Sequence, residues 1–244
     1  MTRWLFDLGN TRLKLAPLSN GELGDVVAIA HAEGDFAAAV EAALPHAGDV
    51  AYLASVASAP TTAAVQDALA KRFARIVVAR TVAEFDGLRI AYANPDKLGV
   101  DRFLALLAAR ARGGAWLVVG VGTALTIDLL DATGAHRGGR IAPSPALMRA
   151  ALHQRARQLP EIGGEYAEFA ADTEAALASG CEGAALALIE RSLAKAGDEC
   201  AAMPGLLLHG GGADALAAHL PQAQIASHLV LRGLAQWAHR GGGE

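Results

Sequence analysis

Two short segments of the chain combine glycine, hydroxyl and charged residues in a way that suits phosphate binding. The first runs from Asp7 to Lys14, with the sequence DLGNTRLK, directly after a short apolar run. A carboxylate at a strand end can hold a hydrated magnesium ion, and a glycine lets the backbone approach a phosphate closely. Asn10, Thr11 and Lys14 add donors for phosphate oxygens. The alternative is an ordinary hairpin turn, in which Asp, Gly and Asn are the expected residues.

The second segment runs from Gly122 to Asp128, with the sequence GTALTID, and is again a glycine turn with hydroxyl residues. Aligning Gly9 with Gly122, 113 positions apart, sets Asp7 opposite Gly120. A turn that recurs at equivalent places indicates a structural duplication. Two facing turns of this kind can clamp a polyphosphate in a cleft between domains, where small-molecule sites concentrate.

A third segment, YANPDKLGVDR from Tyr92 to Arg102, carries a carboxylate and a guanidinium side by side. Its proline and glycine mark a loop that leads into a helix beginning near Val100. Asp101 and Arg102 then fall in the first helical turn. One interpretation is a general base beside an anion-binding group. The other is a carboxylate favoured by the helix dipole, next to a surface charge.

The last motif is HGGGAD, from His209 to Asp214, which follows the apolar run LLL. Glycines between a buried strand and a helix allow a flat ring or a phosphate to lie against the backbone. A tight strand-to-helix turn explains the same residues. His209 by itself is more typical of a packed or solvent-exposed histidine than of a ligand.

The apolar patterns that must position these motifs alternate between strands and helices. Strands are expected over residues 4–6, 13–17, 26–29, 51–56, 76–78, 116–119, 124–130, 136–141 and 206–208. Helices are expected over residues 36–44, 61–73, 100–112, from 143 or 145 to about 158, 174–196 and around 229–237. This order predicts two α/β domains, residues 1–113 and 114–244, each with a central and mostly parallel sheet.

Composition excludes several classes of protein. With 21 basic and 25 acidic residues the net charge is −4, and aromatic residues make up only 5%, so a nucleic-acid surface is not expected. Cys181 and Cys200 are expected to be free thiols of a reducing compartment. No signal peptide is recognised, and the most apolar stretch, residues 115–130, is too polar to span a membrane. We therefore expect a cytoplasmic protein.

Taken together, the motifs resemble those of the type III pantothenate kinases, which belong to the sugar-kinase, heat-shock-protein-70 and actin superfamily. The resemblance covers nearly the whole chain and rests on FDLGNTRLK, NPDKLGVDR, GTALTID with GGRIAPSPALM, DTEAALASGC and HGGGAD, in this order. It implies ATP-dependent phosphorylation of pantothenate to 4′-phosphopantothenate, the entry to coenzyme A. It also implies two duplicated ribonuclease-H-like domains with ATP in the cleft between them, and a homodimer.

The resemblance assigns roles to particular residues. The residues that it places around ATP are Asp7, Leu8, Gly9, Asn10, Thr11, Arg12, Leu13, Lys14 and Thr123, with Asp7 near the magnesium ion. The residues that it places around pantothenate are Tyr92, Gly99, Val100, Asp101, Arg102 and Thr173. Asp101 matches the proton acceptor of the family. Members of the family need magnesium and a monovalent cation, either potassium or ammonium.

One position departs from the family pattern. The family commonly has an aspartate two residues before the glycine of the second phosphate motif, as a cation ligand, and this chain has Gly120 there. We therefore expect a weaker or absent potassium dependence. Two alternatives stay open. The first is that the chain is a sugar kinase, an acetate kinase or a polyphosphate phosphatase of the same superfamily, and the segment YANPDKLGVDR argues against it. The second is that the chain is a nucleotide-binding regulator without catalytic activity. The missing aspartate at Gly120 supports this alternative, and the presence of Asp7, Asp101 and Arg102 argues against it.

Overall fold

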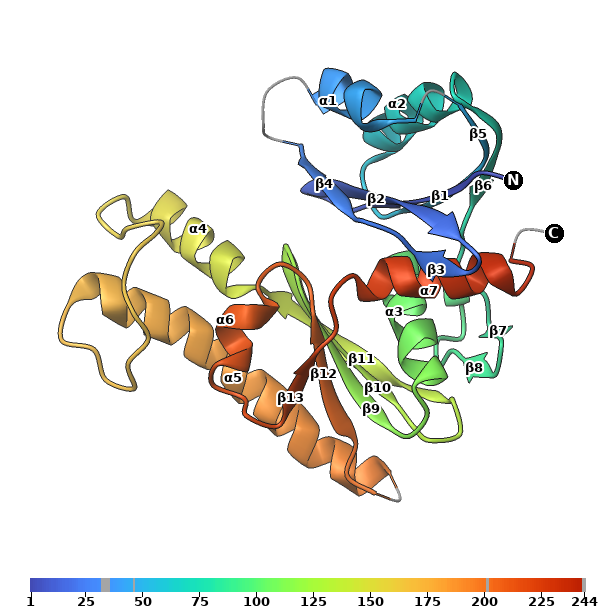
Figure 1. Ribbon diagram of the computed structural model, residues 1–244. Helices are drawn as coiled ribbons and strands as arrows, with labels where there is room; N and C mark the ends of the chain where they lie inside the picture. The colour runs from blue at the N-terminus through green and yellow to red at the C-terminus, as the bar shows by residue number, and fades with distance from the viewer. Residues whose placement is uncertain (32–35, 46, 201, 243–244) are drawn as a thin grey trace. The chain divides into compact units, whose positions relative to one another are not determined.

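The structure is a computed structural model that describes residues 1–31, 36–45, 47–200 and 202–242. The chain divides into two compact units (Figure 1). Unit 1 comprises Met1–Arg112 and His228–Glu244, and unit 2 comprises Gly113–Ser227.

Unit 1 is built on a mixed six-stranded sheet. Its strands are β1 (Arg3–Leu8), β2 (Arg12–Ser19), β3 (Glu22–Leu23), β4 (Val27–Ala30), β5 (Gly48–Ser55) and β6 (Phe73–Val78). The order is β3-β2-β1-β5-β6, with β4 also paired to β2. The hairpin pair β1 and β2 is antiparallel, whereas β1, β5 and β6 run parallel. Phe73 was expected at the end of a helix, but it begins β6, where its ring packs edge-on against Phe6 at 5.6 Å between centroids.

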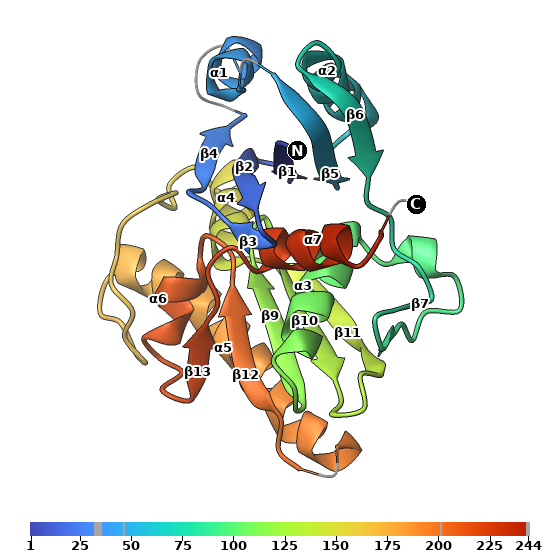
Figure 2. The same ribbon diagram turned by 45° about the vertical axis from the view of Figure 1, so that its right-hand side comes forward.

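Helices cover both faces of this sheet (Figure 2). The helices on one face are α1 (Phe36–Ala43) and α2 (Ala59–Ala70), and those on the other are α3 (Val100–Ala111) and α7 (Leu229–His239). A short hairpin, β7 (Glu84–Phe85) and β8 (Leu88–Arg89), and the turn η1 (Pro95–Lys97) precede α3.

Helix α7 groups with unit 1, whereas the sequence placed it in a second domain over residues 114–244. The reason is a close helix crossing. A Cβ atom on Gly233 would lie only 1.9 Å from the carbonyl oxygen of Leu104 on α3, so only glycine allows this approach. Trp237 of α7 adds an edge-on contact with Tyr52 of β5, at 6.4 Å between ring centroids. Such contacts join residues far apart in sequence, which local patterns do not show.

Unit 2 is built on a mixed five-stranded sheet with the order β11-β10-β9-β12-β13. Its strands are β9 (Trp116–Val121), β10 (Ala124–Leu130), β11 (His136–Pro143), β12 (Gly205–His209) and β13 (Ala223–Ile225). Its helices are α4 (Pro145–Arg155), α5 (Thr173–Glu199) and α6 (Ala213–Ala217). The core lies between one face of the sheet and helices α5 and α6, and it includes Val119, Ile127 and Ile189.

The two units repeat one topology. In each, a three-stranded antiparallel meander is followed by two strands that continue in parallel on the other side of the first strand. Strand β9 begins 113 positions after β1 begins, and it ends 113 positions after β1 ends. This is the same offset that relates Gly9 to Gly122. The predicted α/β fold with two duplicated ribonuclease-H-like domains is confirmed. The expectation of mostly parallel sheets is wrong, because the hairpins make much of each sheet antiparallel.

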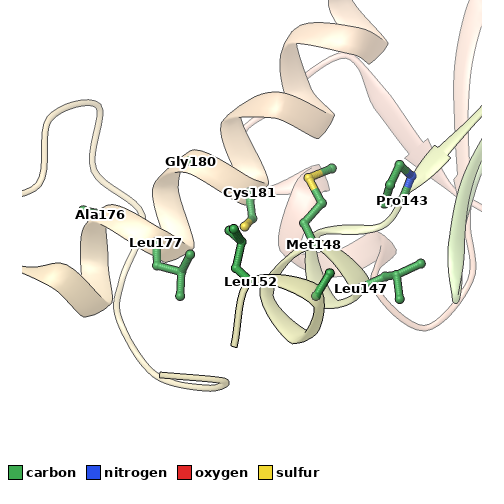
Figure 3. Close-up of a pocket in the computed structure, with 9 residues that line it drawn as sticks. Pro143, Leu147, Met148, Leu152, Ala176, Leu177, Gly180 and Cys181 are labelled. Atoms are coloured by element: carbon green, nitrogen blue, oxygen red, sulfur yellow. The ribbon is translucent and has the colours of Figure 1, made fainter. Parts of the chain in front are cut away.

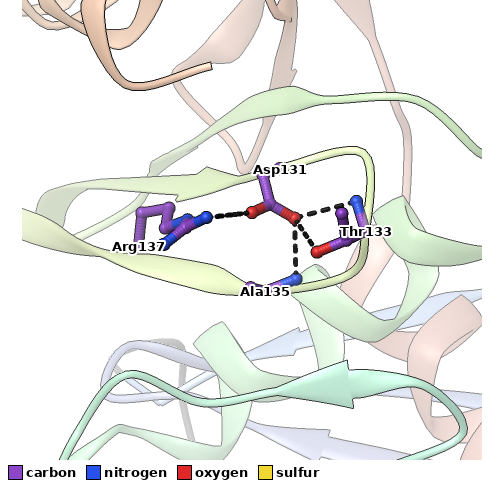
Figure 4. A network of polar contacts seen from close by, with 4 residues as sticks. All are labelled: Asp131, Thr133, Ala135 and Arg137. Carbon is purple, nitrogen blue, oxygen red and sulfur yellow. Dashed lines mark hydrogen bonds and ion pairs between the residues drawn. The ribbon is translucent and has the colours of Figure 1, made fainter. Parts of the chain in front are cut away.

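The hairpin between β10 and β11 is closed by a buried carboxylate (Figure 4). Asp131 Oδ1 accepts hydrogen bonds from the backbone and hydroxyl of Thr133 and from the backbone of Ala135, at 2.7 to 2.9 Å. Its other oxygen pairs with Arg137 at 2.8 Å. Burial alone would raise the pKa of Asp131, but these donors together lower it. The network fixes the register of the two strands.

Both cysteines of the chain are free thiols, as expected from their spacing. Within the described residues, no helix is long and apolar enough to cross a membrane.

Candidate active site

The turn between β1 and β2 has buried apolar residues on either side and exposed polar residues at its tip. The backbone N–H of Gly9 donates to the carbonyl of Arg12 at 3.1 Å, which closes a tight turn. Leu8 and Leu13 on either side are fully buried in the core. Asn10, Thr11 and Arg12 are exposed at the tip. The predicted ATP segment is therefore a tight, hydrogen-bonded turn with exposed polar residues at its tip.

Asp7 is the electrostatic centre of this turn. It lies directly across from Lys14 in the β1–β2 register and is half-buried. Burial raises the pKa of its carboxyl to about 6; the Lys14 charge opposes this rise and the Asp101 charge adds to it. Strands β1 and β2 and helix α3 thus bring these three charged groups within electrostatic reach of one another.

A magnesium ion fits Asp7 on chemical grounds. A carboxylate that has lost water and faces a second carboxylate is stabilised by a cation. In the part of the chain that the structure describes, no three His, Cys, Asp or Glu side chains gather as a metal centre. Magnesium is commonly held by one or two carboxylates together with substrate phosphates, which matches a single residue such as Asp7.

Asp101 lies in the first turn of α3, against a glycine. Its Oδ1 accepts the backbone N–H of Arg102 at 2.8 Å. A Cβ atom on Gly99 would fall 2.6 Å from this same oxygen, so the glycine leaves room for the carboxylate. The preceding loop is anchored by Thr81, whose hydroxyl donates to the carbonyl of Leu98 at 2.8 Å. The position of Asp101 is therefore fixed by its own helix and by a tied loop.

Arg102 is buried, with only 6% of its surface exposed, so the alternative of a surface charge is wrong. Its guanidinium lies 5.9 Å from the centre of the Tyr92 ring, and one of its N–H groups donates to the Tyr92 hydroxyl at 3.3 Å. The neighbouring Val100 is also buried. Five of the residues predicted around pantothenate thus lie on α3 or in the loop before it: Tyr92, Gly99, Val100, Asp101 and Arg102.

The second glycine turn, in unit 2, is held by a serine that the sequence did not single out. The backbone N–H of Gly122 donates to the carbonyl of Ala124 at 3.0 Å, and Thr123 is exposed. The buried Ser144 donates its hydroxyl to the carbonyl of Thr123 at 3.0 Å and accepts the backbone N–H of Leu147. A serine before a proline at a helix start was the available signal, since this is a common N-cap.

Thr173 is the first residue of α5 and lies in unit 2, whereas the other residues predicted around pantothenate lie in unit 1. Asp172 caps the helix by accepting the backbone N–H of Ala175 at 2.9 Å. Thr173 is exposed and lines a hollow of about 700 Å³ together with Tyr166 and Phe169.

A second hollow, of about 640 Å³, lies between α4 and α5 (Figure 3). Its lining is almost entirely apolar and includes Leu147, Met148, Leu152 and Leu177. Burial raises the pKa of the Cys181 thiol at its edge, which disfavours a reactive thiolate. None of the residues predicted for ATP or pantothenate lines this hollow, so it is not the candidate site.

Comparison with known proteins identifies the family. The sequence model of the type III pantothenate kinases matches residues 4–195. The chain belongs to the type III pantothenate kinase family. Relatives named type III pantothenate kinase from Stenotrophomonas maltophilia K279a and Xanthomonas campestris pv. campestris B100 are 58% and 56% identical, over 98% of both chains.

Solved structures support the fold alone. A Baf-family chain from Campylobacter jejuni has a TM-score of 0.66 at 20% identity, with 98% of both chains covered. Component A of the (R)-2-hydroxyglutaryl-CoA dehydratase of Acidaminococcus fermentans has a TM-score of 0.51 at 11% identity, with both chains fully covered.

Proposed function

We propose that the chain transfers the terminal phosphoryl group of ATP to the primary hydroxyl of pantothenate, giving 4′-phosphopantothenate in the first step of coenzyme A biosynthesis. Membership of the type III pantothenate kinase family supports this activity. The observation that carries the proposal is the cluster of Asp7, Lys14 and Asp101, which lies within one unit and includes the start of α3, where Arg102 is buried.

Asp101 is the proposed proton acceptor. The hydrogen bond from the backbone N–H of Arg102 holds this carboxylate in one position, as a proton acceptor must be held. Arg102, fixed by Tyr92, is proposed to hold the pantothenate carboxylate or to neutralise developing charge. Gly99, Val100 and Thr173 complete the proposed pantothenate contacts. Phosphoryl transfer needs mainly this positioning and charge compensation.

The ATP contacts are proposed to be Asp7 to Lys14 of unit 1 and Thr123 of unit 2. The exposed Asn10 and Thr11 donate to phosphate oxygens, and Lys14 contributes a positive charge. Asp7 holds the magnesium ion, which neutralises phosphate charge during transfer when it is bound. Leu8 and Leu13 act as anchors of the turn, because they are fully buried.

We also propose that the active form is a homodimer and that potassium or ammonium activates the enzyme weakly or not at all. The family resemblance supports the dimer. Gly120 supports the second proposal, because it offers no side-chain oxygen for a desolvated cation.

The substitution Asp101→Asn tests the catalytic assignment. Asparagine can keep the hydrogen bond to the backbone of Arg102 but cannot accept a proton, so binding survives and chemistry slows. We expect kcat to fall by about 10²–10⁴-fold with a modest change in the pantothenate KM. The matched control is Asp96→Asn, an exposed carboxylate of the preceding loop, which should leave kcat unchanged. Near-native turnover by Asp101→Asn would show that Asp101 is only a helix-start residue.

A further inference from the structure

Each unit carries one row of three residues across its three central strands, near the end of the first strand. The rows are Lys14, Asp7 and Ala54 in unit 1, and Thr126, Gly120 and His209 in unit 2. Residues paired across neighbouring strands point to the same face of the sheet. The two rows are equivalent places of the duplicated fold, because Asp7 and Gly120 are 113 positions apart.

In unit 2 an imidazole fills the space in which unit 1 has the Asp7 side chain. A Cβ atom built on Gly120 would lie 3.0 Å from Nε2 and 3.2 Å from Cε1 of His209. It would also lie 2.7 Å from the hydroxyl oxygen of Thr126. The His209 ring therefore extends across Gly120 towards Thr126, and glycine at position 120 is what permits this.

The backbone that follows His209 lies against the end of β9, the strand that leads into the glycine turn proposed to bind ATP. His209 ends β12 and is paired with Gly120 of β9, and β9 leads directly into Gly122 and Thr123. The backbone N–H of Gly212 donates to the carbonyl of Val121 at 3.1 Å. Gly210 has φ +97°, and a Cβ atom there would lie 2.3 Å from the same carbonyl oxygen. The turn after His209 is thus held by close backbone contacts against β9, the strand that leads into the Gly122–Thr123 turn.

We propose that His209 is an ATP-binding residue whose ring N–H donates to a phosphate oxygen of ATP at the Gly122–Thr123 turn. This proposal rests on the proposed function. Imidazole has an N–H donor in both its neutral and its protonated form, and phosphate oxygens accept without needing a particular tautomer. The ring also occupies the space that a side chain at position 120 would need.

The test compares His209→Ala with the native chain in ATP binding and in turnover. Binding is followed by fluorescence titration with a mant-labelled ATP analogue and magnesium, without pantothenate. A hydrogen bond to a charged group is worth about tenfold or more in affinity, so the dissociation constant and the ATP KM should rise by at least that factor. The pantothenate KM should change little. Added imidazole should restore part of the lost affinity, because the vacated space matches the ring.

Two variants make the result specific. His209→Gln keeps an N–H donor of similar reach and should lose less affinity than His209→Ala, and it serves as the test if His209→Ala does not fold. His239→Ala removes an exposed histidine at the end of α7 and should bind ATP as the native chain does. Melting temperatures confirm that each variant is folded.

The outcomes separate this proposal from the proposed function. Native affinity for the ATP analogue in His209→Ala, with no effect of imidazole, would overturn the role of His209 while kinase turnover stands. Absence of 4′-phosphopantothenate formation by the native chain would overturn the proposed function. In that case the binding titration still decides whether His209 contacts nucleotide.

Discussion

Replacing Gly99 by alanine should reduce catalysis without removing any reacting group. Gly99 has φ −53° and ψ 137°, which alanine adopts freely, so the backbone does not change. The added methyl group would lie 2.6 Å from Asp101 Oδ1, against about 3.4 Å for an ordinary contact, so the carboxylate must move by ~0.8 Å. A misplacement of about 1 Å can cost 10²-fold in rate, so we expect kcat to fall by about 10- to 100-fold.

The assay is steady-state formation of 4′-phosphopantothenate at saturating ATP and magnesium. The reduction should appear in kcat more than in the pantothenate KM, and it should be smaller than that of Asp101→Asn. The matched control is Gly180→Ala on α5, where the new methyl group meets nothing within 4 Å. That change should leave kcat unaltered and should raise the melting temperature slightly, because alanine favours helix.

A near-native kcat for Gly99→Ala, in a protein whose melting temperature shows that it is folded, would contradict this role of Gly99. It would mean that the carboxylate position seen against Gly99 is not the one used in catalysis.

Three other features can be tested: the charge of Asp7, the two thiols and the response to cations. The folded pKa of Asp7, about 6, lies above its ordinary value of 3.8, so ligand-free stability should fall as pH rises through this interval. Asp7→Asn should therefore raise the melting temperature at pH 8 relative to the native chain, with the difference vanishing below pH 4, while the magnesium requirement for turnover increases. Reducing agents should leave activity and melting temperature unchanged, because Cys181 and Cys200 are free; a large drop in melting temperature would contradict this. Rates in sodium, potassium, ammonium and a bulky organic cation should differ little at equal ionic strength, and steep activation by potassium would count against the role given to Gly120. Gly120→Asp alone should create no dependence, because His209 and Thr126 already fill that space.

Local patterns were enough to predict the elements that carry chemistry. The apolar run before Asp7 and the glycine turn after it predicted the β1–β2 hairpin, and the loop glycine before Val100 predicted the start of α3. The repeat of the turn 113 positions later predicted the duplication. These features depend on neighbours in sequence, which is why they were visible there.

Contacts between distant segments were not visible in the sequence. The burial of Arg102 depends on how α3 packs in unit 1. The close approach of α7 to α3 depends on a single glycine, Gly233, that no periodicity distinguishes. The sequence also showed that position 120 lacks a carboxylate, but not that the imidazole of His209 lies across it. Each of these requires the three-dimensional packing of elements far apart in the chain.

The kinase activity is tested by incubating the purified native chain with ATP, magnesium and pantothenate and measuring the products by mass spectrometry. We expect equal amounts of ADP and 4′-phosphopantothenate, formed only with magnesium and much reduced in Asp101→Asn. Binding of ATP without any 4′-phosphopantothenate, or phosphorylation of a sugar or acetate in place of pantothenate, would contradict it.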